Sequence, residues 1–97
     1  MNEITNKIGQ LKLIPVVVIE DSDNAIPLAQ ALIKGELPCA EVTFRTVAAA
    51  DSIAKMSQLP GLLLGAGTVL TVDQVKLAID AGAEFIEPIQ LGHELAD

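Results

Sequence analysis

Two kinds of hydrophobic pattern alternate along this chain, one typical of buried strands and one typical of helices. Residues 14–19 form a nearly continuous β-branched run that ends at Glu20 and Asp21, and this run predicts a strand buried on both faces. Apolar positions then recur at helical spacing, beginning after the capping residues 21–23 and stopping at Gly35. The first third of the chain is therefore predicted to be one strand followed by one helix.

The same order of strand and helix recurs twice more, and a fourth strand follows. Further strands are predicted over residues 39–44, 62–64 and 84–87, and the second of these runs into the glycine-rich segment 65–69. A helix is predicted over about 47–58, and another begins at Thr71, which has Gln74 at capping-box spacing, and stops at Gly82. Strand starts are separated by roughly 22–26 residues, the length of one βα unit.

These units predict an α/β fold in a single partial domain over residues 1–97. A short amphipathic helix is predicted over residues 1–12, and the four βα units occupy residues 13–97. Four such units joined by right-handed crossovers make either an open doubly wound sheet or the N-terminal half of an eight-stranded (β/α)₈ barrel. The periodicity alone does not choose between these two architectures.

The polar residues of the segment 40–46 favour the barrel. Because strand side chains alternate between faces, Glu41, Thr43 and Arg45 are predicted to share one face. A polar face is unfavourable beneath the helices of an open sheet but is suited to the interior of a barrel, near the carboxyl ends of the strands. Two alternatives remain at this point, a solvated edge strand and a structural ion pair between Glu41 and Arg45.

The composition of the chain disfavours several classes of function. A net charge of −7 disfavours binding to nucleic acid or to an anionic membrane surface, and no apolar run approaches the ~20 residues of a membrane span. The start of the chain lacks the features of a secretory signal, which makes the cytoplasm the expected compartment. Cys39 is the only cysteine and His93 the only histidine, so we expect no disulfide, no metal site and no cofactor.

Four segments of the sequence carry a family resemblance, and they occur in a specific order and spacing: residues 15–18 (PVVV), 40–46 (AEVTFRT), 65–69 (GAGTV) and 81–86 (AGAEFI). Together they resemble the class I aldolases that cleave 2-keto-3-deoxy-6-phosphogluconate (KDPG) and 4-hydroxy-2-oxoglutarate (KHG) to pyruvate and an aldehyde. The likeness runs from about residue 10 to residue 95 and covers only the N-terminal half of that family's barrel.

The resemblance implies a set of roles. It implies a cytoplasmic lyase of the Entner–Doudoroff type of carbohydrate metabolism, assembled as a homo-oligomer, usually a trimer, that acts on a small keto acid through a Schiff base. By resemblance, Glu41 is the catalytic general acid and base, Arg45 binds a substrate carboxylate, and Thr68 helps to seat the pyruvyl group. A buried carboxyl with a raised pKa and a planar guanidinium suit these tasks.

Two departures from the family pattern affect this interpretation. The Schiff-base lysine of the family lies on a later strand, whereas the five lysines of this chain fall on predicted helices or their flanks, so we expect the isolated chain to be inactive. After Phe85 and Ile86, the family usually continues with a Ser-Pro-Gly turn, and this chain has residues 87–90 (EPIQ) instead.

Two other functions stay open beside the aldolase interpretation. One is a non-catalytic half-barrel that serves as a scaffold or self-associates. The other is an open-sheet binding domain of the receiver type, which would need an acidic triad and a lysine at the end of a late strand. The sequence offers no such lysine.

Overall fold

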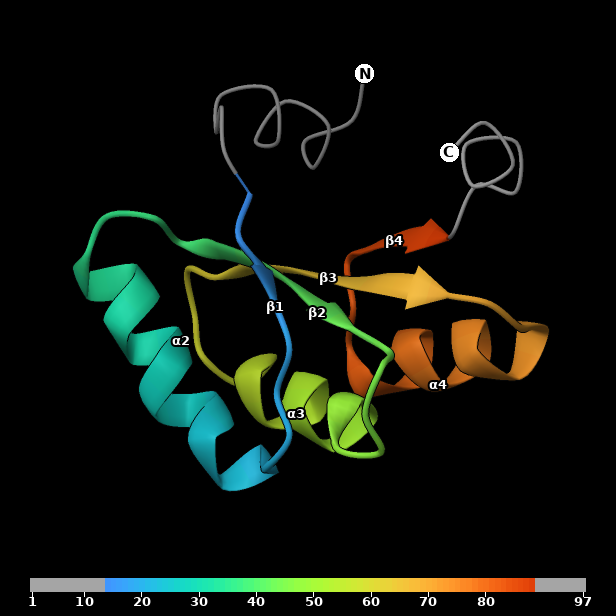
Figure 1. The fold of residues 1–97 in the computed structure, drawn as a ribbon. Helices are drawn as coiled ribbons and strands as arrows, with labels where there is room; N and C mark the ends of the chain where they lie inside the picture. Colours follow the sequence, from blue (N-terminus) through green and yellow to red (C-terminus); the bar gives the residue numbers. More distant parts are fainter. Residues whose placement is uncertain (1–13, 89–97) are drawn as a thin grey trace, which may run out of the picture.

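Residues 14–88 are described by the computed structural model, and they build one parallel sheet with its helices on a single face (Figure 1). The strands are β1 (Val16–Val17), β2 (Cys39–Thr43), β3 (Leu63–Val69) and β4 (Phe85–Pro88), paired in the order β1-β2-β3-β4. A doubly wound sheet reverses its strand order at a switch point, and this sheet does not. The sequential order and the one-sided helices confirm four parallel strands that alternate with helices, as in part of a barrel, and the described residues end with the fourth strand.

The helices that cover the sheet are η1 (Ser22–Asn24), α2 (Ala25–Lys34), α3 (Ala49–Met56) and α4 (Val72–Ala81). They pack on the even-numbered residues of the two central strands, such as Val42 and Leu64, and enclose Ile53 and Met56 of α3. This core is aliphatic, as the low aromatic content of the chain predicts. The helix predicted over residues 1–12 lies outside the described residues.

The first strand differs from its prediction. Only Val16 and Val17 pair with β2, and the side chains of Val16 and Val18 are 62% and 53% exposed, although burial on both faces was expected. Val17 packs on the helix-covered core, so its two neighbours point to the opposite face. β1 is the edge strand of the sheet and has a neighbouring strand on one side only, so its side chains away from the helices stay exposed, whereas the inner strand β2 is buried on both faces.

The ends of the helices follow from their capping residues. The hydroxyl of Thr71 accepts a hydrogen bond from the backbone N–H of Gln74 at 3.1 Å, and the Gln74 side chain accepts one from the N–H of Thr71 at 3.3 Å. This reciprocal pair is the predicted capping box of α4. The same helix ends at Gly82, whose φ of 110° is a left-handed conformation that suits glycine.

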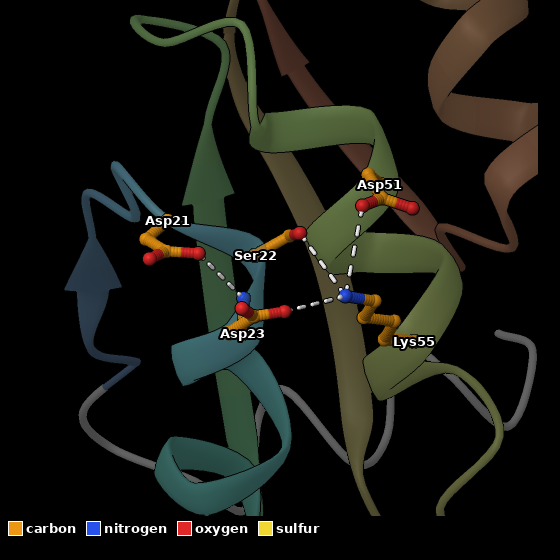
Figure 2. Close-up of polar contacts among 5 residues, drawn as sticks. All are labelled: Asp21, Ser22, Asp23, Asp51 and Lys55. Carbon is orange, nitrogen blue, oxygen red and sulfur yellow. Dashed lines mark hydrogen bonds and ion pairs between the residues drawn. The ribbon is translucent and has the colours of Figure 1, made fainter.

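A polar cluster joins the first helical turn to α3 (Figure 2). The side chain of Asp21 caps η1 by accepting the N–H of Asp23 at 2.9 Å. The Nζ of Lys55 lies 3.1 Å from the hydroxyl of Ser22, 3.4 Å from a carboxylate oxygen of Asp23 and 3.7 Å from one of Asp51. The predicted capping role of the residues after β1 is therefore confirmed, and Lys55 adds a contact that fixes this loop on the helix layer.

The left-handed end of α4 generates a testable prediction for stability. We expect Gly82→Ala to lower the free energy of unfolding by about 1–2 kcal/mol, because a left-handed backbone costs about that much for a residue with a Cβ. The new Cβ would also approach the Ser57 side chain to 2.8 Å. Chemical denaturation of the 97-residue chain measures the effect, and Gly35→Ala is the control because Gly35 ends α2 at a φ of −81°. Equal losses in the two variants would contradict this account.

Candidate active site

Two glycines on β3 form the floor of the candidate site. Gly65 and Gly67 point to the face of the sheet opposite the helices, since their neighbours Leu64 and Ala66 belong to the helix-covered core. A Cβ on Gly65 would collide with the Phe85 ring, and a Cβ on Gly67 would lie 2.7 Å from the Cδ of Glu41. Side chains from the strands on either side, β2 and β4, therefore extend over β3, where glycine leaves them room.

Glu41 lies against this floor from β2. Its register partners are Val16 on β1 and Gly65 on β3, neither of which is charged. The side chain is only 7% exposed, and its Oε1 has no hydrogen-bond partner. Thr43, two residues further on the same face, is 2% exposed and its hydroxyl also has no partner. Buried polar atoms are nearly always hydrogen-bonded, so two unsatisfied groups on one face indicate a functional site.

Glu87 is the neighbour of Glu41 that sequence reasoning missed. Gly67 is in register with Glu87 on β4, so the two carboxyl groups approach each other across the glycine floor from β2 and β4. Burial raises the pKa of Glu41, and the side-chain hydrogen bond and negative charge of Glu87 raise that pKa further, to about 7. Glu41 is thus poised to exchange a proton near neutral pH.

The strand pattern predicted that Arg45 shares a face with Glu41, and the structure places Arg45 just beyond the end of that strand. The strand β2 ends at Thr43, although the N–H of Phe44 still donates to the carbonyl of Gly67 at 2.8 Å. Arg45 follows in a turn, and its side chain is exposed. Because the alternation of faces holds only while a strand continues, the shared face of Glu41 and Arg45 stays a prediction. No ion pair joins Glu41 to Arg45 within residues 14–88, which also rules out the structural ion pair left open by the sequence.

The loop that carries Arg45 is nevertheless held in place at the carboxyl ends of the strands. The hydroxyl of Thr46, the next residue, donates a hydrogen bond of 2.5 Å to the carbonyl of Ile19, which lies just after β1. This bond ties the loop after β2 to the end of the first strand. Arg45 is therefore at the edge of the sheet where barrel enzymes bind their substrates, with its guanidinium free to reach solvent-borne anions.

Thr68 sits in a β-bulge at the end of β3. The pairing with β4 passes from Gly67↔Glu87 to Val69↔Pro88, so Thr68 is an extra residue on its strand. Its φ is 56°, a left-handed value that is rare for a β-branched residue. Bulges near active sites re-aim side chains, and backbone strain concentrates at functional positions. The structure thus gives Thr68 a special conformation that its sequence context did not predict.

The three lysines within residues 14–88 lie on helices, as the sequence predicted. Lys34, Lys55 and Lys76 are on α2, α3 and α4, and no lysine occupies a strand in the part of the chain that the structure describes. Lys7 and Lys12 are outside it, as is His93. Among residues 14–88 no group of three potential metal ligands forms, and none of the helices described there is long and apolar enough to cross a membrane.

Comparison with protein families identifies the family of this chain. Residues 4–97 match the family model described as "Aldolase: KDPG and KHG aldolase". The chain belongs to the KDPG and KHG aldolase family. It is 49% identical over 87 residues to the 2-dehydro-3-deoxy-phosphogluconate aldolase of Treponema pallidum (strain Nichols), a match that covers 89% of this chain and 41% of the relative. It spans about two fifths of the length of such curated relatives.

Solved structures of the family superpose on this fold. The KDPG aldolase of Zymomonas mobilis ZM4, crystallised with 3-phosphoglycerate, matches with a TM-score of 0.82 and 39% identity over 99% of this chain and 48% of that one. The KDPG aldolase of Legionella pneumophila, with pyruvate captured as a covalent carbinolamine, matches with a TM-score of 0.72 and 42% identity over 79% and 38% of the two chains. The four strands and the helices between them thus match part of the family's barrel.

The bulge generates a prediction that separates strain from packing. We expect Thr68→Gly to be more stable than Thr68→Ala, by up to about 1 kcal/mol, because glycine avoids the cost of the left-handed backbone. The order should reverse at Thr43, on the regular strand β2, where alanine should be the more stable of the two. Urea denaturation of the four variants tests this, and the same order at both positions would count against strain at Thr68.

The raised pKa of Glu41 predicts how stability depends on pH. The carboxyl loses its proton near pH 4.5 in the unfolded chain and near 7 in the native chain. The native state therefore binds more protons between these values, and the free energy of unfolding should fall as pH rises through this window. Well above pH 7 the loss of unfolding free energy reaches a constant value of roughly 3 kcal/mol.

The comparison with Glu41→Gln isolates this effect. Denaturation of the native chain and of Glu41→Gln between pH 4 and 8 should give a difference in unfolding free energy that grows with pH in favour of the variant. Glu36→Gln, an exposed change after α2, is the control and should give a constant difference. A Glu41→Gln difference that is independent of pH would show that Glu41 titrates normally.

Proposed function

We propose that this chain forms the N-terminal part of a class I aldolase site that cleaves KDPG or KHG to pyruvate and an aldehyde. The observation that carries the proposal is Glu41, a carboxyl that is nine-tenths buried, lies on the interior face of the sheet and has a pKa of about 7. Family membership supplies the reaction class. In the proposed site the Schiff-base lysine comes from a barrel strand beyond the four described.

Glu41 suits both proton transfers that such a reaction needs. Collapse of a carbinolamine requires a proton on its hydroxyl, which then leaves as water while the nitrogen lone pair forms the iminium. A neutral Glu41 carboxyl gives that proton and becomes a carboxylate. The carboxylate takes the proton of the C4 hydroxyl, whose electrons form the aldehyde C=O. The C3–C4 bond breaks, and its electrons pass through the iminium to give the enamine of pyruvate.

Arg45 and Thr68 are proposed to hold the substrate. A guanidinium binds carboxylate or phosphate with two parallel hydrogen bonds, and Arg45 is exposed at the carboxyl edge of the sheet. Thr68 is the bulged residue at the end of the neighbouring strand β3, so its hydroxyl is proposed to contact the pyruvyl group. We further propose that the complete enzyme is a cytoplasmic homo-oligomer, a trimer on the family resemblance.

The test is a chimera in which this chain replaces the aligned half of the Zymomonas mobilis aldolase. The chimera should release pyruvate from KDPG or KHG, whereas the isolated 97-residue chain should form no adduct with pyruvate after borohydride reduction. Glu41→Gln should lower kcat by a factor on the order of 10² to 10⁴. Arg45→Lys should mainly raise KM.

A control variant and two contrary outcomes complete the test of the chimera. Glu36→Gln, an exposed change in the loop between α2 and β2, should leave both constants unchanged. A folded chimera without aldolase activity, or one in which Glu41→Gln turns over normally, would reject the proposed function. It would favour the alternative of a non-catalytic half-barrel scaffold that self-associates through its uncovered face, on which Val16 and Val18 are exposed.

A further inference from the structure

Among residues 14–88, Glu41 has one charged neighbour, and this neighbour has no assigned role. The described strands beside Glu41 offer it Val16 on β1 and Gly65 and Gly67 on β3. Glu87 on β4 is the titratable group that faces it, and it does so across the glycine floor. The exposed Arg45 makes no ion pair with either carboxyl.

We propose that Glu87 is a positioning residue for Glu41, because its carboxylate accepts a hydrogen bond from the protonated Glu41 carboxyl and holds that proton over Gly67. The geometry supports a shared proton in three ways. Glu41 is nearly inaccessible to water and its Oε1 lacks any other partner. Gly67 has no side chain that would stand between the Glu41 and Glu87 side chains. Glu87 is itself exposed, so a negative charge at this position remains hydrated.

The arrangement has a chemical consequence for the site. Two carboxyl groups that share a site cannot both ionise readily, so one of them retains a proton well above its usual range. Here the buried member retains the proton and the exposed member provides the charge. Glu87 therefore adds to the effect of burial in keeping Glu41 in the neutral form that can act as an acid. This assignment deepens the proposed function, since it gives Glu41 its protonation state, but the proton sharing itself does not require aldolase activity.

The test is the titration of Glu41 in the full 97-residue chain, followed by the ¹³C resonance of its side-chain carboxyl. Glu41→Gln identifies the resonance by its loss. In the native chain we expect a midpoint near neutral pH, and a curve with two steps, because coupled groups titrate as a pair. Glu87→Gln should lower the Glu41 midpoint by about one unit or more, since it removes the neighbouring charge.

A matched control removes a nearby charge that does not face Glu41. Glu84 precedes β4, and its side chain accepts the N–H of Leu64 at 3.3 Å, a bond that glutamine retains. Glu84→Gln should leave the Glu41 midpoint in place. An unchanged Glu41 midpoint in Glu87→Gln, or a single-step curve in the native chain, would overturn the proposal and leave burial as the whole cause of the raised value. The native curve decides the question even if Glu87→Gln does not fold.

The titration can reject the pairing of Glu41 with Glu87 without rejecting the proposed function, and the reverse also holds. A two-step Glu41 curve in the chain together with an inactive chimera would reject the aldolase function and keep the carboxyl pair. An active chimera together with a Glu41 midpoint that ignores Glu87→Gln would keep the function and reject the pair. In an active chimera, Glu87→Gln should also shift the alkaline limb of the kcat profile to lower pH, because the acid form of Glu41 is lost earlier.

Discussion

The structure of the candidate site depends on the lack of side chains at two positions of β3. Strands in a parallel sheet lie about 4.8 Å apart, so residues on β2 and β4 are separated by a whole strand and ordinarily do not meet. Gly65 and Gly67 remove that barrier on the face away from the helices. The ring of Phe85 occupies the space over the first glycine, and the carboxyl of Glu41 lies over the second. Without this floor Glu41 could neither be buried nor approach Glu87.

Much of the fold follows from local sequence pattern. The capping box at Thr71, the end of α4 at Gly82 and the buried run of β2 are determined by residues within a few positions of each other, and all three were predictable. The barrel-like strand order was favoured by the polar face of β2 and is confirmed by the sheet topology. What failed was burial of the first strand, because exposure depends on what covers a face and not on the strand's own residues.

The site was predictable only in part, for a related reason. Glu41 was identified because a carboxylate in a buried strand is costly and conspicuous. The sequence did not pair Glu87 with Glu41, since their meeting depends on the register of three strands. The shared face of Glu41 and Arg45 stays a prediction, because β2 ends one residue earlier than expected and side chains alternate regularly only within a strand. Residues that act through long-range register are the ones that a single sequence conceals.

The bulge at the end of β3 also affects how freely the site and the fold can change separately. Along β3 the even residues Leu64 and Ala66 face the helices, yet the odd residue Val69 also joins that core, because one additional residue intervenes. Thr68 is therefore the additional residue that reverses the alternation of side chains between the two faces of β3. A deletion of Thr68 alone would leave every other side chain of β3 on its present face. Position 68 can therefore be deleted or substituted in evolution without repacking the core. The site can thus change at this position while the packing of the sheet stays the same.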